Sequence, residues 1–281
     1  MKQSWTYSIQ QEGQTIDELL RDQWKLGKKT VHELRMTKAI SDTNGELLQW
    51  KLPRTKGTEI VVTLDVPESS YEATLDCDVK VIYEDQDCLI VSKPKGMATH
   101  PNDVWDRDTC MNHVMKYVQD QGGVYAEHAH RLDQGTSGLL LVAKHPIAKS
   151  IFDRLLEEKK IVRVYEAEVQ GHMKERQGTI RGPIAKDRHH GTRRRVSPEG
   201  QMAITNFEVV RHLEHSTVVN LVLETGRTHQ IRVHLAYIGH PIVGDTLYDA
   251  RETASGDYSL HARKLKFIHP FTGTRMEILD K

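Results

Sequence analysis

One short segment of the chain combines residue types that acid–base or nucleophilic catalysis needs. Residues 129–141 (AHRLDQGTSGLLL) place Asp133 two residues after Arg131 in a turn, and an apolar run follows at once. A loop anchored by a buried strand is a common platform for catalysis. Asp133 could act as a nucleophile, as a general base or as the cap of the turn, and turn chemistry by itself favours the cap.

Two further segments carry clustered positive charge. Residues 224–235 (ETGRTHQIRVHL) place Arg227 ahead of a predicted helix, with Arg232 further along. A cation at a helix N-terminus opposes the helix dipole, so Arg227 is expected to have an acidic partner elsewhere, although an exposed surface arginine is the simpler interpretation. Residues 186–195 (KDRHHGTRRR) predict either a phosphate-contacting loop or merely a solvated one.

Histidine and cysteine spacing does not favour a metal site. His229 and His234 are five residues apart, not the four that place two ligands on one helical face. The chain has three cysteines and no C-x-x-C pair, which argues against zinc and disulfides and fits a reducing compartment. Phosphate-loop, dinucleotide-binding and nucleophile-elbow motifs are also absent from the sequence, so we expect no metal and no nucleotide cofactor.

Short strands and a few helices are predicted to position these segments. Residues 138–144 are typical of a buried central strand, and Pro146 is well placed to begin a helix. In 164–169 (VYEAEV), strict alternation places Tyr165 on one side of a strand. Thr228 is predicted to cap a further helix. With other strands at 79–83, 89–92, 206–210 and 217–224, the pattern predicts an α+β fold with a mixed, mostly antiparallel sheet.

Composition and charge narrow the class of protein. The 281 residues are 38% hydrophobic and carry no net charge, yet residues 144–195 hold fourteen basic and seven acidic side chains. Such a cluster suggests a polyanion partner, although charge runs alone more often mark a solvated face. The apolar runs are far shorter than the ~20 residues that cross a bilayer, and no secretory signal is found. We expect a cytoplasmic monomer with no membrane segment.

Two domains are predicted. A small N-terminal domain at 1–66 is followed by a linker at 67–77 and a larger domain at 78–281. In the first, residues 15–24 form a helix candidate whose capping box is Thr15 and Glu18, and 59–64 form a strand candidate.

Six blocks of the larger domain resemble, in order, the motifs of the RluA family of RNA pseudouridine synthases. They cover roughly 70% of the chain, and six ordered matches are far more specific than any one of them. The blocks are 83–97, which contains SKPKGM; 130–139 (HRLDQGTSGL); 164–171 (VYEAEVQG); 200–207 (GQMAITNF); 226–245, which begins with GRTHQIR; and 260–273, which contains HPFTG.

The resemblance implies the pseudouridine synthase fold with flanking helices and an RNA-binding cleft. It also implies isomerisation of specific uridines in structured RNA, ribosomal RNA foremost and transfer RNA as the other candidate. The enzyme would break the N1–C1′ bond, turn the uracil and rejoin it through C5, without cofactor or metal. The target base must first be flipped out of its stack.

Residue roles follow from the same resemblance. Asp133 matches the catalytic carboxylate, as nucleophile or base, and Arg227 matches the arginine that pairs with it. Tyr165 matches the ring that stacks on the target base. Arg131 matches the residue that enters the space left by the flipped nucleotide. The other expected RNA-binding residues are His130, Lys186, Arg188, Arg193, Arg194 and Arg195.

Two other functions compete with this interpretation. A non-catalytic RNA-binding or ribosome-assembly factor on the same fold is opposed by the family's residue types at the Asp, Tyr and Arg positions. A metal-dependent nuclease lacks the ligand spacing. The N-terminal domain resembles a degenerate form of the RNA-binding module that many family members carry, with residues 27–34 and 44–45 in the places of its helix pair and turn.

Overall fold

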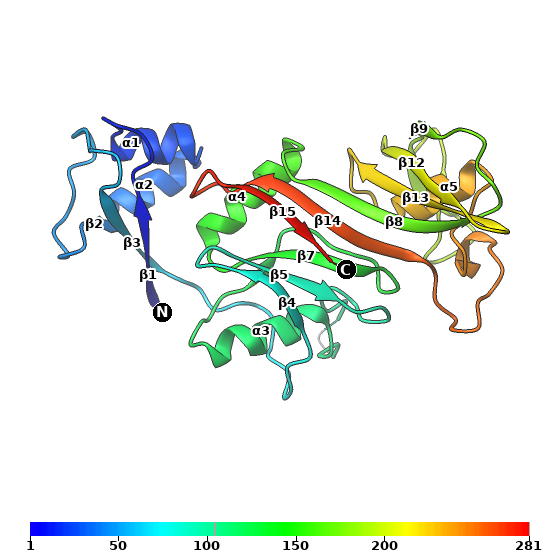
Figure 1. Cartoon of the computed structure of the whole chain (residues 1–281). Helices are drawn as coiled ribbons and strands as arrows, with labels where there is room; N and C mark the ends of the chain where they lie inside the picture. Colours follow the sequence, from blue (N-terminus) through cyan, green and yellow to red (C-terminus); the bar gives the residue numbers. More distant parts are fainter. Residues whose placement is uncertain (104, 281) are drawn as a thin grey trace.

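The computed structural model describes residues 1–103 and 105–280. Figure 1 shows a small N-terminal unit at one end of the molecule and a larger body built around one long, twisted sheet. The predicted α+β class with a mixed, mostly antiparallel sheet is confirmed, since among the paired strands described only β7 and β14 run parallel. Within the described residues, none of the helices has the length and apolar content of a membrane-spanning segment.

The N-terminal unit is a three-stranded sheet covered by short helices. Its strands are ordered β1-β3-β2. The predicted capping box is confirmed, because Thr15 and Glu18 bond to each other's backbone N–H groups; the helix is short and continues as a π-helical turn. The elements are β1 (Lys2–Ser8), α1 (Ile16–Glu18), η1 (Leu19–Gln23), α2 (Lys28–Met36), β2 (Ile40–Ser41) and β3 (Glu59–Asp65).

The body has a ten-stranded sheet ordered β4-β5-β7-β14-β8-β13-β12-β9, with β15 beside β14 and β6 beside β7. A separate hairpin, β10–β11, lies outside that sheet. The elements are β4 (Lys80–Glu84), β5 (Cys88–Lys93), α3 (Cys110–Asp120), β6 (Glu127–His128), β7 (Ser137–Ala143), α4 (Pro146–Glu157), β8 (Val162–Gln170), β9 (Gln177–Arg181), β10 (Ile184–Lys186), β11 (Arg194–Val196), β12 (Ile204–His212), β13 (Ser216–Leu223), α5 (Gln230–Tyr237), η2 (Thr246–Tyr248), β14 (Leu260–Ile268) and β15 (Arg275–Leu279).

The central strand β7 is buried on both faces, as its apolar run predicts. Leu139 and Leu141 pack in one cluster with residues of α4, while Leu140 and Val142 pack in another with residues of α3. The two helices therefore cover opposite faces of this half of the sheet. Pro146 is the first residue of α4, as predicted, because its fixed φ suits that position.

At the centre of the sheet, β7 and β14 approach closely next to the loop that holds Asp133. Gly138 has a φ of +108°, and a Cβ atom at this position would lie 2.3 Å from the carbonyl oxygen of Ala262 on β14. Only glycine fits both the backbone conformation and the contact. The close pairing places the start of β7 against the strand that adjoins β8.

The N-terminal unit is packed onto the body through one shared apolar cluster. Tyr7 of β1 stacks on Phe271 with ring centroids 5.1 Å apart, and Trp24 meets the same ring edge-on. The Tyr7 hydroxyl donates a 2.6 Å hydrogen bond to Asp87, which is only 1% exposed. His145 also contacts that carboxylate, at 3.0 Å. The N-terminal unit and the body therefore share one continuous apolar core.

Replacing Tyr7 with phenylalanine is expected to lower the free energy of unfolding by about 1–3 kcal/mol, because a buried carboxylate loses a donor. Urea unfolding followed by tryptophan fluorescence measures the change. Tyr237→Phe is the matched control, since that side chain is 63% exposed. Equal stability of Tyr7→Phe and the wild type would contradict a contribution of this hydrogen bond to the docking of the two units.

Candidate active site

A pocket of about 350 Å³ lies over the middle of the sheet, where β7, β14 and β8 are neighbours. The turn that precedes β7, the first part of β8 and the segment leading into α5 form its walls. The structure brings the three predicted catalytic residues together here, since Asp133, Tyr165 and Arg227 all line this pocket. Its volume lies at the lower end of the range for small-ligand sites, which is adequate for a nucleoside.

Buried polar groups hold the backbone of the turn that carries Asp133. Thr99 and Leu132 exchange two hydrogen bonds, in which the Thr99 hydroxyl accepts from the Leu132 amide and donates to its carbonyl. The Lys93 ammonium, which is 0% exposed, donates to the carbonyl of Gln134 at 3.1 Å. The Asp133 carbonyl closes the turn by accepting from the amide of Thr136. These contacts fix the backbone on both sides of Asp133.

Lys93 is a buried cation that, within residues 1–103 and 105–280, has no carboxylate in contact. Its ammonium also donates to the carbonyls of Pro94 and Met97, at 2.8 and 2.7 Å. Burial lowers the pKa of Lys93 to about 8, and the charge of Asp133 opposes that shift. A buried ammonium satisfied by three carbonyl oxygens is a fixed, directional support for the turn.

The ionic partner of Asp133 is Arg232. The Arg232 Nη1 atom lies 3.7 Å from Asp133 Oδ2, while its Nε donates to Asp245 at 2.7 Å. Burial alone would lower the pKa of Arg232, but its bond to Asp245 and the neighbouring negative charges raise it above the usual value. The guanidinium is therefore a permanent cation, and it lies within ion-pair distance of the Asp133 carboxylate.

The prediction that Arg227 pairs with Asp133 is wrong. Arg227 is exposed, and its Nε lies 3.4 Å from the carbonyl oxygen of Met202. The prediction that Thr228 caps the helix is wrong as well, because the cap is His229, whose φ is +58°. The helix therefore begins at Gln230. Arg232 lies in its first turn and faces inward, while Arg227 stays outside the helix at the rim of the pocket.

Tyr165 presents its ring to the floor of the pocket. The predicted alternation of β8 is confirmed, since Tyr165, Ala167 and Val169 are all buried. Burial raises the pKa of Tyr165, the positive charge of Arg163 lowers it, and Asp133 raises it further. The phenol therefore stays protonated at neutral pH and offers an apolar face with one hydroxyl.

The structure separates the predicted RNA-binding residues into two groups. Arg131 is exposed at the mouth of the pocket and, within the described residues, forms no ion pair. The prediction that His130 binds RNA is corrected by the structure. The His130 ring is only 8% exposed, and its Nε2 accepts a hydrogen bond from the amide of Leu141 at 3.3 Å. Burial and nearby positive charges lower the pKa of His130 to about 3. A neutral, buried imidazole braces β7 and offers no charge to a phosphate.

The remaining basic residues belong to the β10–β11 hairpin, beside a second pocket of about 540 Å³. Lys186 and Arg194 line this second pocket, and Arg227 borders both pockets. Arg188 and Arg193 form ion pairs with Glu199 and Asp249. Arg195 is exposed on β11. The hairpin is thus a basic edge next to the active-site pocket.

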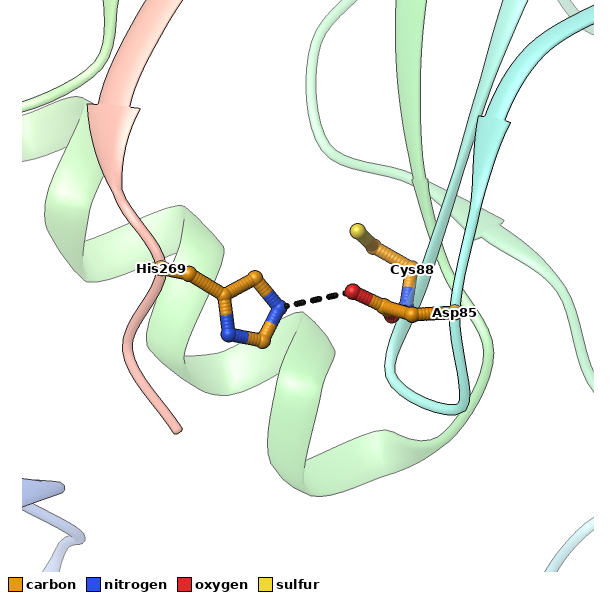
Figure 2. A group of neighbouring side chains, drawn as sticks. All are labelled: Asp85, Cys88 and His269. Atoms are coloured by element: carbon orange, nitrogen blue, oxygen red, sulfur yellow. Dashed lines mark hydrogen bonds and ion pairs between the residues drawn. The ribbon is translucent and has the colours of Figure 1, made fainter. Parts of the chain in front are cut away.

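One group of three side chains could in principle hold a metal ion. Figure 2 shows Asp85 and Cys88 at the β4–β5 turn with His269, from the segment after β14, facing them; none of the three lines the first pocket. The Asp85 carboxylate already accepts from Tyr83 and from two backbone amides, and its Oδ2 lies 3.1 Å from His269 Nε2. Burial raises the pKa of the Cys88 thiol, which keeps it protonated. A saturated carboxylate and a protonated thiol are poor ligands, and we assign no metal to the group.

Four residues of the site were not assigned a role from the sequence. Arg232 was noted only as lying beyond Arg227, and Asp245 only as part of a motif. Tyr258 and Tyr248 both contact the Arg232 guanidinium, with ring centroids 4.5 and 5.0 Å from its carbon. A useful signal was available, because Arg232 is the only Lys, Arg, Asp or Glu in the segment Gln230–Tyr237, and it is buried there together with five neighbours.

Sequence and structure comparisons agree on the family. Residues 87–237 match the model of the RNA pseudouridylate synthases, and residues 3–60 match the model of the N-terminal domain of ribosomal pseudouridine synthase RluD. The chain belongs to the RNA pseudouridine synthases, as its motifs predicted, and is an isomerase that converts uridine in RNA to pseudouridine.

Individual relatives cover nearly the whole chain. The uncharacterized RNA pseudouridine synthase YhcT of Bacillus subtilis (strain 168) is 39% identical over 93% of this chain and 87% of its own length. The ribosomal large subunit pseudouridine synthase D of Escherichia coli (strain K12) is 32% identical, over 97% of this chain and 88% of its own. Human RNA pseudouridylate synthase domain containing 1 superposes with a TM-score of 0.59 at 26% identity, covering 73% of this chain and 83% of its own. None of these names supports the alternative of a non-catalytic factor.

Proposed function

We propose that this enzyme modifies uridines of large-subunit ribosomal RNA, with Asp133 as its catalytic carboxylate. The observation that carries the assignment is the Asp133–Arg232 contact at 3.7 Å in a pocket that Tyr165 also lines. The ribosomal substrate is supported by the name of the enterobacterial relative and by the N-terminal match. We propose that the enzyme is a cytoplasmic monomer, and a ribosomal RNA substrate supports the cytoplasmic location.

In the proposed reaction, the flipped uracil stacks on Tyr165 while Asp133 faces the ribose. Asp133 acts as nucleophile or base while the N1–C1′ bond breaks, and the base then turns so that C5 bonds to C1′. We propose that the Tyr165 hydroxyl relays the C5 proton to solvent, accepting it as it donates its own proton, and N1 takes up a proton. Atoms and electrons balance without any co-reactant. The fixed Arg232 charge lies 3.7 Å from the Asp133 carboxylate, whose negative charge is consumed as it attacks C1′ or takes a proton and is regenerated when C5 bonds to C1′.

The basic residues are proposed to hold the RNA around this pocket. Arg131 fills the place that the flipped nucleotide vacates, and Lys186, Arg194 and Arg195 contact the backbone from the β10–β11 hairpin. Their positions at the second pocket and on the exposed strand support this role. Arg188 and Arg193 contribute less to RNA binding, because each already forms an ion pair with an acidic residue. We propose that residues 1–66 act as a docked domain that extends this RNA-binding surface.

A pseudouridine map of ribosomal and transfer RNA tests the substrate. RNA from cells lacking the gene is compared with RNA from cells complemented by the wild-type gene or by the Asp133→Asn gene. We expect one or a few uridines of the large-subunit RNA to lose the modification, and only the wild-type gene to restore it. Losses confined to transfer RNA would contradict the ribosomal assignment. Restoration by the Asp133→Asn gene would contradict the role of Asp133.

A further inference from the structure

Arg163 lies in the active-site pocket, although no motif drew attention to it. It is on β8, two residues before Tyr165, and side chains two residues apart on a strand point to the same face. Both residues line the first pocket. The sequence therefore places a guanidinium beside the ring proposed to stack on the flipped base.

The charge of Arg163 has no ionic partner in the part of the chain that the structure describes. Among the residues that the structure describes, its guanidinium forms no ion pair, and its Nε is buried without a hydrogen bond. Arg232, the other guanidinium inside the pocket, is held instead by Asp245 and Asp133. A half-buried cation without a counter-ion costs free energy, and an anionic ligand would remove that cost.

The Arg163 guanidinium is open to a ligand at the start of the segment leading into α5. A methyl group on Gly226 would lie 3.5 and 3.7 Å from its two terminal nitrogens, and glycine leaves that space free. The same wall carries the exposed side chain of Arg227 and the N-terminus of α5. A guanidinium with two free N–H groups near a helix N-terminus favours a phosphate oxygen pair.

We propose that Arg163 binds a backbone phosphate of the RNA next to the flipped uridine and so holds that nucleotide over Tyr165. The ligand is a phosphodiester, and the proposal rests on the proposed function of this pocket. Arg163 is a substrate-binding residue in this assignment, distinct from the pair formed by Asp133 and Arg232. A phosphate bound to Arg163 beside the Tyr165 ring would hold the ribose next to the Asp133 carboxylate.

The first test is the salt dependence of RNA binding, which requires no turnover. An unmodified transcript of large-subunit ribosomal RNA is titrated with wild-type protein, Arg163→Met, Arg163→Lys and Arg211→Met at several salt concentrations. Arg211 is the matched control, because it is an exposed arginine on β12 that does not line the pocket. Loss of one phosphate contact should reduce the slope of log K against log salt by about one in Arg163→Met, while Arg211→Met keeps the wild-type slope. An unchanged slope in Arg163→Met would overturn the proposal.

The second test uses a synthetic stem–loop around the mapped uridine, in which one phosphate at a time is replaced by an uncharged methylphosphonate. We expect the phosphate adjoining the uridine to matter most, with its neutralisation weakening wild-type binding about 10-fold or more. Arg163→Met should bind the unmodified stem–loop and the stem–loop with that methylphosphonate equally well. Arg163→Lys should recover part of the difference in affinity that the wild type shows between these two RNAs. Equal sensitivity of wild type and Arg163→Met at every phosphate would show that Arg163 contacts none of them.

Two competing roles give different results. If Arg163 acts on the ionisation of Tyr165, Arg163→Met shifts the pH dependence of the rate and leaves RNA affinity unchanged, which overturns the proposal. If Arg163 only supports the fold, the variant melts at a lower temperature and Arg163→Lys does not restore RNA affinity. Should the wild type form no pseudouridine in the transcript, the proposed substrate fails, while the salt slope still decides whether Arg163 binds a phosphate.

Discussion

Asp133→Asn is expected to abolish pseudouridine formation while leaving the fold and RNA binding intact. Asparagine has nearly the same shape, yet it can neither attack carbon as an anion nor accept a proton. Removal of a residue of this kind typically lowers the rate about 10⁴-fold or more. The fold should tolerate the change, since Arg232 keeps both bonds to Asp245 and the Asp133 side chain is 21% exposed.

The assay for Asp133→Asn is single-turnover release of the C5 hydrogen from tritium-labelled uridine in unmodified ribosomal RNA. RNA affinity should be unchanged or slightly higher, because a negative charge leaves a basic pocket. Asp22→Asn is the control, since that side chain is exposed in the N-terminal unit. A rate for Asp133→Asn within a factor of ten of the control would contradict the role of Asp133.

Arg232→Met should affect both stability and catalysis. Asp245 is 1% exposed and would lose both bonds to the guanidinium. An unpaired buried carboxylate of this kind costs about 3–5 kcal/mol of unfolding free energy. Asp133 would lose its only ionic partner among the described residues. The rate should fall about 10²- to 10³-fold, as it does when a preorganised charge is removed from a site.

A double substitution separates these two effects. Arg232→Met combined with Asp245→Asn removes the unpaired buried charge, so much of the lost stability should return while the rate stays low. Recovery of the rate together with stability would mean that Arg232 acts only through the fold. Urea unfolding and the tritium-release assay measure the two quantities on the same preparations.

Arg227→Met is the matched comparison, because it makes the same chemical change five residues earlier. Its side chain is exposed and far less constrained, so stability should change by no more than about 0.5 kcal/mol. RNA binding should weaken, since Arg227 borders both pockets, while the rate at saturating RNA is largely kept. A larger rate loss in Arg227→Met than in Arg232→Met would favour the pairing that the motif alone suggested.

Local sequence patterns correctly predicted those helices and strands whose formation depends mainly on their own residues. The alternation of β8 placed Tyr165 correctly because a strand has a side-chain period of two, whatever lies around it. The apolar run of β7 and the proline at the start of α4 were equally reliable. β1 is absent from the predicted strands although its side chains alternate regularly between buried and exposed, and its partner β3 lies more than fifty residues away.

The residues predicted to act in catalysis follow from motifs that occur in the same order as in the family. A chain rarely has the Asp, Tyr and Arg motifs in that order by chance. From the turn alone, Asp133 was as well explained by a cap. The sequence by itself thus determined the family and the reaction, and it predicted Asp133 as the catalytic carboxylate and Tyr165 as the stacking ring.

Only the tertiary structure decided which cations serve that carboxylate. A motif that holds two arginines five residues apart does not say where its helix begins, and the left-handed backbone of His229 moves that start past Thr228. Arg232 then faces inward toward Asp133 and Asp245, and Arg227 remains outside. Arg163 likewise became visible only once its neighbours were known. Whether a charge is paired depends on groups brought together from distant parts of the chain, and no local pattern carries that information.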